Sequence, residues 1–146
     1  MRAPRFANAP IILISIDTLR ADAVGGFGAP VQQTPNLYIV GNEGIRFPNA
    51  ISAAHITAPS HATMLTGLSP FVHGLTMAKQ GMAYSLPSQI PTLAEILQKA
   101  GYQTAAFTDG IQLLPELGFA RGFETYEANP RGCAKRRRGS PSSWPT

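Results

Sequence analysis

Cysteine is almost absent from the sequence, since Cys133 is the only one among 146 residues. A lone cysteine excludes an internal disulfide framework and any zinc site built on cysteines. Long apolar runs are also missing: the longest aliphatic stretch, residues 11–16, is far shorter than the roughly 20 residues that cross a bilayer. It is also too short for a secretory signal peptide. The sequence therefore predicts a soluble chain with no transmembrane segment, cytoplasmic as it stands.

Charge is scarce in the body of the chain and concentrated near its end. Residues 131–138 hold five of the 12 Lys and Arg residues and no acid. Outside this run, seven basic residues face eight acidic ones, so the body is close to neutral. A short basic run is usually a solvated end, and no nucleic-acid partner is expected. A basic-tailed binding module is an alternative, and it predicts salt-sensitive nucleic-acid binding that needs residues 131–146.

Composition divides the chain into three parts. Residues 1–9 form an N-terminal extension, and residues 10–130 have the apolar content of one domain with a sizeable core. Residues 131–146 lack an apolar period and are expected to be a basic, disordered tail. One hypothesis is that this tail is a frameshifted reading of GC-rich DNA, which the encoding DNA read in its other two frames would test.

Apolar patterning predicts strands and helices in alternation. Residues 10–17 are apolar on both faces, as in a buried parallel strand, and residues 102–109 read as another strand. Helices are predicted at residues 34–44, 59–66 and 92–101. Strand–helix–strand order with crossovers of this length favours an α/β fold, with a parallel sheet covered by helices.

Capping residues mark two of these helices. Thr34 is the predicted N-cap of the first helix, and Gly44 lies past its end. Thr92 and Glu95 have the spacing of a capping box at the start of the last helix. The apolar residues of that last helix fall on one face: Leu93, Ile96, Leu97 and Ala100.

Asp17 ends the first predicted strand, at the edge where open α/β sheets bind ligands. Its carboxylate is suited to a divalent cation such as Ca²⁺, Mn²⁺, Zn²⁺ or Mg²⁺, because hard cations prefer oxygen ligands. Asp17 could equally cap the turn that follows, and the sequence alone weighs the two alternatives evenly.

Hydroxyl groups gather where the helix at 59–66 begins. By spacing alone, Thr57 or Ser60 is an ordinary N-cap, and this reading is favoured. The functional alternative makes Thr57 a nucleophile, since a helix N-terminus stabilises an anionic ester. A cation held by Asp17 would lower the pKa of the Thr57 hydroxyl and activate it.

Histidines provide the remaining candidates near this helix. His61 is expected about one turn after Thr57, where it could orient the nucleophile or contact the ester oxygens. His55 and His73 are weaker candidates that could equally be surface residues. Lys79 could contact an anionic substrate, although a lone loop lysine is usually just solvated.

Six stretches of the chain, taken together, resemble the N-terminal third of the sulfatase family, within the alkaline-phosphatase-like superfamily. In order they are IILISIDTLRAD, TPNL, EGIRF, NAISAAHITAPSHATMLTGLSPFVHG, PTLAEILQKAGYQTAAF and GFARGFETYE. The resemblance implies a mostly parallel sheet flanked by helices. It also implies metal-dependent hydrolysis or transfer at a phosphate or sulfate ester, on a small-molecule, lipid or glycan substrate.

Three site residues are carried over from this resemblance. Asp17 matches the family's first metal-binding aspartate. Thr57 matches the nucleophile, itself a metal ligand, in the signature C/S-x-P-S-R, which reads T-A-P-S-H in this sequence. His61 takes the place of the signature's arginine.

The sequence also departs from the family pattern. True sulfatases oxidise Cys or Ser at the Thr57 position to formylglycine, and threonine cannot form that aldehyde. Thr18 stands where a second aspartate is usual, and FTDG at 107–110 replaces an element that carries a lysine and a histidine. Threonine at the nucleophile position is similar to superfamily members that cleave or transfer phosphate esters.

The family's later metal ligands, an Asp followed by His or Asn, have no counterpart in the sequence, because it contains no Asp-His pair. One aspartate and one threonine are too few ligands to hold a divalent ion firmly. The chain is therefore expected to be inactive, or nearly so, by itself. The alternative is a non-catalytic fragment or pseudogene product.

Overall fold

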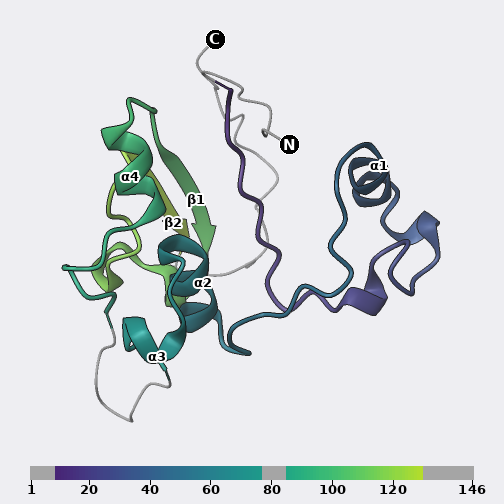
Figure 1. The fold of residues 1–146 in the computed structure, drawn as a ribbon, viewed down its shortest axis with the longest axis horizontal. Helices are drawn as coiled ribbons and strands as arrows, with labels where there is room; N and C mark the ends of the chain where they lie inside the picture. Colours follow the sequence, from purple (N-terminus) through teal and green to yellow (C-terminus); the bar gives the residue numbers. More distant parts are fainter. Residues whose placement is uncertain (1–8, 77–84, 130–146) are drawn as a thin grey trace, which may run out of the picture. The chain divides into compact units, whose positions relative to one another are not determined.

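Two units make up the described part of the chain, residues 9–76 and 85–129 of the computed structural model (Figure 1). The first unit ends at Ala50 and the second begins at Ile51. The predicted tail and Lys79 lie outside the described residues. Within the described ranges, no helix combines the length and apolar character that crossing a membrane requires.

The first unit contains one α-helix and two short 3₁₀-helices: η1 (Ala21–Ala23), η2 (Val31–Gln33) and α1 (Pro35–Glu43). The helix predicted at 34–44 is confirmed. Pro35 suits its first position, since a proline has a fixed φ and no N–H that needs a partner there. Thr34 is the N-cap residue, but its Oγ1 accepts a 2.7 Å hydrogen bond from the Gly25 N–H. The Thr34 hydroxyl therefore stabilises the loop at Gly25 and does not cap α1.

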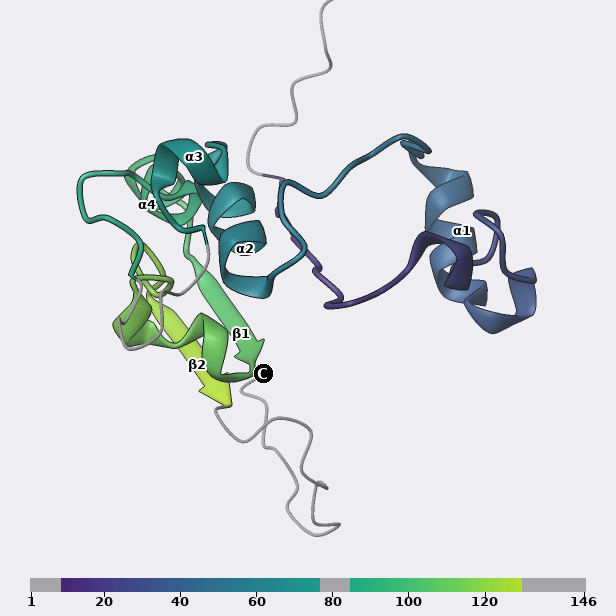
Figure 2. The ribbon, with the colours of Figure 1, turned by 90° about the horizontal axis from the view of Figure 1, so that it is seen from below.

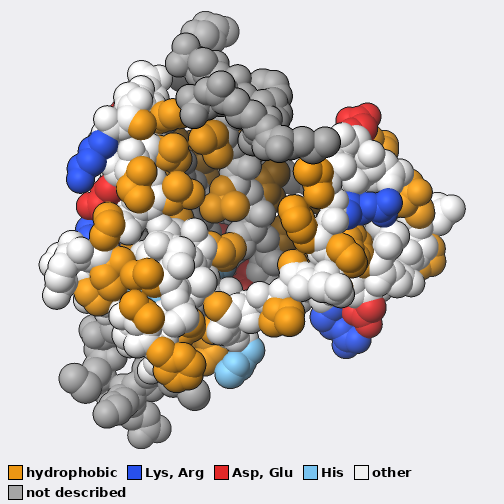
Figure 3. Space-filling model, viewed as in Figure 1, with side chains coloured by type: hydrophobic (Ala, Val, Ile, Leu, Met, Phe, Trp, Pro, Cys, Tyr) orange, Lys and Arg blue, Asp and Glu red, His pale blue; other side chains and the backbone are white. Residues whose placement is uncertain are grey.

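The prediction of a buried strand at residues 10–17 is wrong. Residues 11–16 are irregular chain whose side chains are exposed, and Ile12 is 81% exposed. A parallel strand buried on both faces needs neighbouring strands and covering helices. In the described residues, the sheet is built from two other segments, both in the second unit. Apolar side chains also reach the surface elsewhere in each unit (Figure 3).

The second unit contains helices and the parallel strand pair. In chain order its elements are α2 (Thr57–Thr66), α3 (Pro70–His73), α4 (Leu93–Lys99), β1 (Ala105–Asp109), η3 (Ile111–Leu113), η4 (Pro115–Leu117) and β2 (Thr125–Asn129). The strands β1 and β2 lie side by side and parallel, with Ala105 opposite Thr125 (Figure 2). The strand predicted at 102–109 forms over its second part, Ala105–Asp109, and ends where expected. Its parallel partner β2 was not among the predicted strands.

Both longer helices of this unit match the prediction in part. α2 begins two residues earlier than expected and ends at Thr66, and the next residue, Gly67, has a left-handed φ of 70°. In α4 the capping box is confirmed: the Glu95 N–H donates to Thr92 Oγ1 (3.1 Å), and the Thr92 N–H donates to Glu95 Oε2 (2.8 Å). The predicted apolar face of α4 is not its buried side, because Leu93 and Ile96 are exposed whereas Ala94 is buried.

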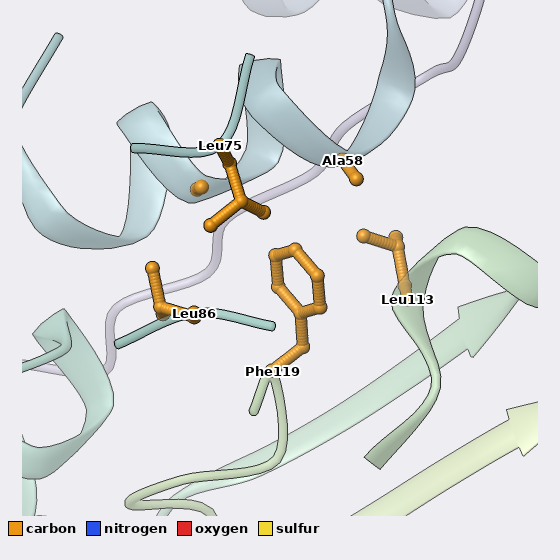
Figure 4. Packing of buried hydrophobic residues seen from close by; sticks show 6 residues of the cluster. Ala58, Leu75, Leu86, Leu113 and Phe119 are labelled. Carbon is orange, nitrogen blue, oxygen red and sulfur yellow. The ribbon is translucent and has the colours of Figure 1, made fainter. Parts of the chain in front are cut away.

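Phe119 lies at the centre of the core of the second unit (Figure 4). Its ring is 1% exposed, and it contributes the largest buried apolar side chain. The other core residues come from α2, from η3 and from the loops around them: Ala58, Ala62, Leu75, Leu86 and Leu113. Because Ala58 and Ala62 belong to this cluster, the core fixes the position of the first two turns of α2.

Arg121 joins several loops of the same unit. Its guanidinium donates hydrogen bonds to the backbone carbonyls of Pro87, Ser88, Ile90 and Gly118, at 2.9 to 3.3 Å. The Arg121 carbonyl in turn accepts a 3.0 Å hydrogen bond from Thr92 Oγ1. The next residue, Gly122, packs so closely on α4 that a Cβ there would lie 2.6 Å from the Cα of Glu95.

Candidate functional site

Thr57 is the first residue of α2, and Ile56 occupies the N-cap position with an extended backbone (φ −120°, ψ 140°). The prediction that Thr57 or Ser60 caps this helix is wrong, because α2 has no side-chain cap and both residues lie inside it. Ser60 Oγ instead lies 3.1 Å from Ser52 Oγ. A helical start at Thr57 is compatible with Pro59, whose missing N–H would have no helical partner in the first turn.

The start of α2 has the electrostatic features that any helix N-terminus offers to an anion. The first N–H groups of any helix have no intrahelical partner, and the helix dipole is positive at that end. Ala58 and Pro59 are buried while Thr57 is half-buried, so the hydroxyl-bearing residue lies at the edge of the core. This arrangement can stabilise negative charge on a group placed beside Thr57.

His61 lies one turn after Thr57 in α2, at the expected position. Its Nδ1 is 2.8 Å from the backbone carbonyl oxygen of Thr57. A carbonyl oxygen can only accept, so Nδ1–H is the donor. The hydrogen bond holds the ring over the first turn of α2.

The two remaining histidines have opposite environments. His55 is exposed, as the alternative reading expected. His73 is completely buried, so the alternative that it is a surface residue is wrong. Its Nδ1 accepts a 3.1 Å hydrogen bond from the Leu75 N–H, and its Nε2 lies 3.1 Å from Thr63 Oγ1. The local signal at this position is that His73 ends a turn that begins with a proline and is followed by Gly74.

Asp17 lies in the first unit, in a turn that follows the exposed residues 11–16. It therefore does not end a buried strand in this structure. The next residue, Thr18, has a φ of 54°, which is an uncommon, strained conformation for a β-branched side chain. Thr57 and His61 share α2 in the second unit, whereas Asp17 belongs to the first unit.

Two of these residues carry side chains of the kind that divalent metal ions bind. The Asp17 carboxylate and the Thr57 hydroxyl are oxygen donors of the kind that hard cations prefer. In the part of the chain that the structure describes, no group of three or more His, Cys, Asp or Glu side chains could hold a metal ion. The donors present fit such an ion in kind but not in number.

Comparison with known proteins shows the family of the chain. Residues 10–135 match the Sulfatase family. The chain is 36% identical to the arylsulfatase of Clostridium perfringens over 94 residues, which is 64% of this chain and 19% of that protein. It is 37% identical to the human N-acetylgalactosamine-6-sulfatase over 109 residues, 68% of this chain and 20% of that protein.

A third relative is the N-acetylglucosamine-6-O-sulfatase of Bacteroides thetaiotaomicron, 36% identical over 95 residues, 65% of this chain and 16% of that protein. The chain thus spans about a fifth of the length of the curated relatives that it matches. The family match covers most of the chain and includes Asp17, Thr57 and His61. The chain belongs to the sulfatase family and resembles sulfuric ester hydrolases.

Proposed function

We propose that this chain carries the nucleophile-bearing part of an alkaline-phosphatase-like ester hydrolase or transferase, with Thr57 as the nucleophile. The observation that carries the proposal is the position of Thr57 at the first residue of α2. There its hydroxyl belongs to a turn whose dipole favours an anionic substrate. The substrate class is a phosphate or sulfate ester of a small molecule, lipid or glycan.

In the proposed reaction, Thr57 Oγ attacks the phosphorus of a phosphodiester opposite the leaving oxygen. The Oγ–P bond forms, the bond to the leaving oxygen breaks, and the hydroxyl proton passes to solvent or base. Backbone N–H groups at the start of α2 stabilise the added negative charge. His61, held by its hydrogen bond to the Thr57 carbonyl, presents Nε2 toward the ester oxygens.

Asp17 and Thr57 are the proposed metal ligands, on the family's sequence pattern. A divalent cation, when bound, lowers the pKa of a coordinated hydroxyl. Two such donors are too few to bind an ion firmly, so we propose that residues 1–146 alone are inactive or nearly so. A complete metal site needs further ligands besides Asp17 and Thr57.

A chimera tests this proposal. The segment of the Clostridium perfringens arylsulfatase that this chain matches is replaced by the corresponding residues of this chain. Metal-dependent cleavage of an aryl phosphodiester is expected, and Thr57→Ala should abolish it while Thr57→Ser retains it. A folded chimera that cleaves neither the aryl phosphodiester nor an aryl sulfate contradicts the proposal. Turnover that survives Thr57→Ala contradicts it as well.

Sulfate ester hydrolysis is the second candidate, because the relatives described above are sulfatases. Threonine cannot be converted to formylglycine, so this activity would need direct attack by the Thr57 hydroxyl. An assay of the same chimera with an aryl sulfate as substrate distinguishes the two candidate functions. We expect turnover of the phosphodiester to exceed that of the sulfate, and the reverse order would favour the second candidate.

A further inference from the structure

His73 is the last residue of α3 and has no exposed surface. Its Nδ1 accepts a 3.1 Å hydrogen bond from the backbone N–H of Leu75. Because an N–H can only donate, Nδ1 carries no proton and the neutral ring has its proton on Nε2. Nε2 lies 3.1 Å from the hydroxyl of Thr63, so the neutral imidazole joins α3 and its following turn to α2.

Among the described residues, the two helices that meet at His73 carry no acidic side chain. α2, the helix packed against α3, contains no Asp, Glu, Lys or Arg, and neither does α3. The titratable side chain of α2 is His61, which donates from Nδ1 to the Thr57 carbonyl at the start of the helix. Burial lowers the pKa of His73 below its ordinary 6.5, with the Pro59 carbonyl acting in the opposite direction.

We propose that His73 is a pH-sensitive clasp, which holds the turn after α3 on α2 when neutral and releases it when protonated. A proton on Nδ1 would face the Leu75 N–H, so two donors would meet in a site closed to water. The Leu75 side chain packs in the same cluster as Phe119 (Figure 4). Release of this turn therefore also disturbs the packing of the core. This device is independent of the ester chemistry.

The direction of the pH effect follows from proton linkage. The unfolded or opened chain binds a proton at His73 near pH 6.5, and the closed form binds it only at lower pH. The stabilisation by the neutral ring is therefore complete above pH 6.5 and is lost as the pH falls through the lower pKa of the closed form.

Nitrogen-15 NMR and amide exchange on the whole chain test the clasp. At neutral pH, His73 should be the Nε2–H tautomer. Between about pH 7.5 and about pH 5.5, the protection factor of the Leu75 amide, corrected for intrinsic exchange, should fall by several-fold and up to about tenfold. A protonated Nδ1 at neutral pH, or unchanged protection of Leu75, overturns the proposal.

Two variants separate His73 from the other histidines. His73→Asn keeps an acceptor for the Leu75 N–H but cannot gain a charge, so its unfolding midpoint should lose most of the pH dependence between about pH 7.5 and about pH 5.5. His55→Asn, at an exposed site, should retain the wild-type dependence. A pH dependence that survives His73→Asn overturns the proposal. If that variant does not fold, the amide exchange of Leu75 in the wild-type chain is the test of the proposal.

Discussion

The Nδ1 atom of His61 donates a 2.8 Å hydrogen bond to the backbone carbonyl of Thr57. The bond runs from the second turn of α2 back to its first residue, so the ring orientation depends on the helix being formed. It also sets the tautomer of the neutral ring, since a carbonyl partner requires the proton on Nδ1. A hydroxyl and an imidazole are thereby positioned by a single turn of helix.

His61 and His73 should be opposite tautomers at neutral to mildly basic pH. The partner of His61 Nδ1 is a carbonyl, which requires Nδ1–H, whereas the partner of His73 Nδ1 is an N–H, which requires a bare nitrogen. Imidazole nitrogen-15 shifts and couplings report the site of each proton. His55, which is exposed, serves as the reference with exchanging tautomers. The same tautomer at His61 and His73 would contradict the structure.

Gly122→Ala should destabilise the second unit by several kcal/mol, because the new Cβ meets backbone atoms of Ala94 and Glu95 that cannot move aside. Chemical denaturation of the whole chain measures the change. Gly101→Ala is the matched control: Gly101 also has a positive φ (89°), but nothing lies within 4 Å of its Cβ position. The control should lose only about 1 to 2 kcal/mol, and equal losses would show that the close approach has no effect.

Arg121→Lys should cost about 2 to 3 kcal/mol, since one ammonium group cannot replace a guanidinium that serves four backbone carbonyls. The free energy of unfolding is the measurement. Arg20→Lys changes an exposed arginine whose partner, Asp22, is also exposed. No measurable change is expected there, and similar effects of the two substitutions would contradict the assigned role of Arg121.

Phe119→Ala should cost about 3 to 5 kcal/mol, because it removes the central side chain of the core and leaves a cavity. Phe71→Ala provides the comparison, since Phe71 is 91% exposed on α3. Its effect should stay within about 0.5 kcal/mol. A small loss for Phe119→Ala would mean that the cluster around this ring does not hold the unit together.

Local signals in the sequence predicted the features that local interactions determine. The capping box of Thr92 and Glu95 requires only residues three positions apart, and it forms as expected. The end of β1 at Asp109 was also predicted, and Gly110, with a φ of 88°, follows it in the structure. The placement of His61 one turn after Thr57 follows from helical spacing alone.

Predictions that depended on distant partners were less successful. Residues 10–17 have the composition of a buried strand, but burial depends on neighbouring strands that composition does not supply. The burial of His73 depends on Thr63 and on the backbone of Leu75, and a single histidine has no periodic pattern that reveals such partners. The N-cap assignment was wrong because Ile56, with no side-chain donor or acceptor, occupies that position.

Acid-quenched mass spectrometry of the phosphodiester-cleaving chimera tests the central claim most directly, since it asks which atom carries the transferred group. We predict a phosphoryl ester on the peptide that contains Thr57, formed during turnover and absent from the Thr57→Ala variant. Steady turnover with an unmodified Thr57 peptide, or with the ester on another residue, would contradict the assignment of Thr57 as the nucleophile.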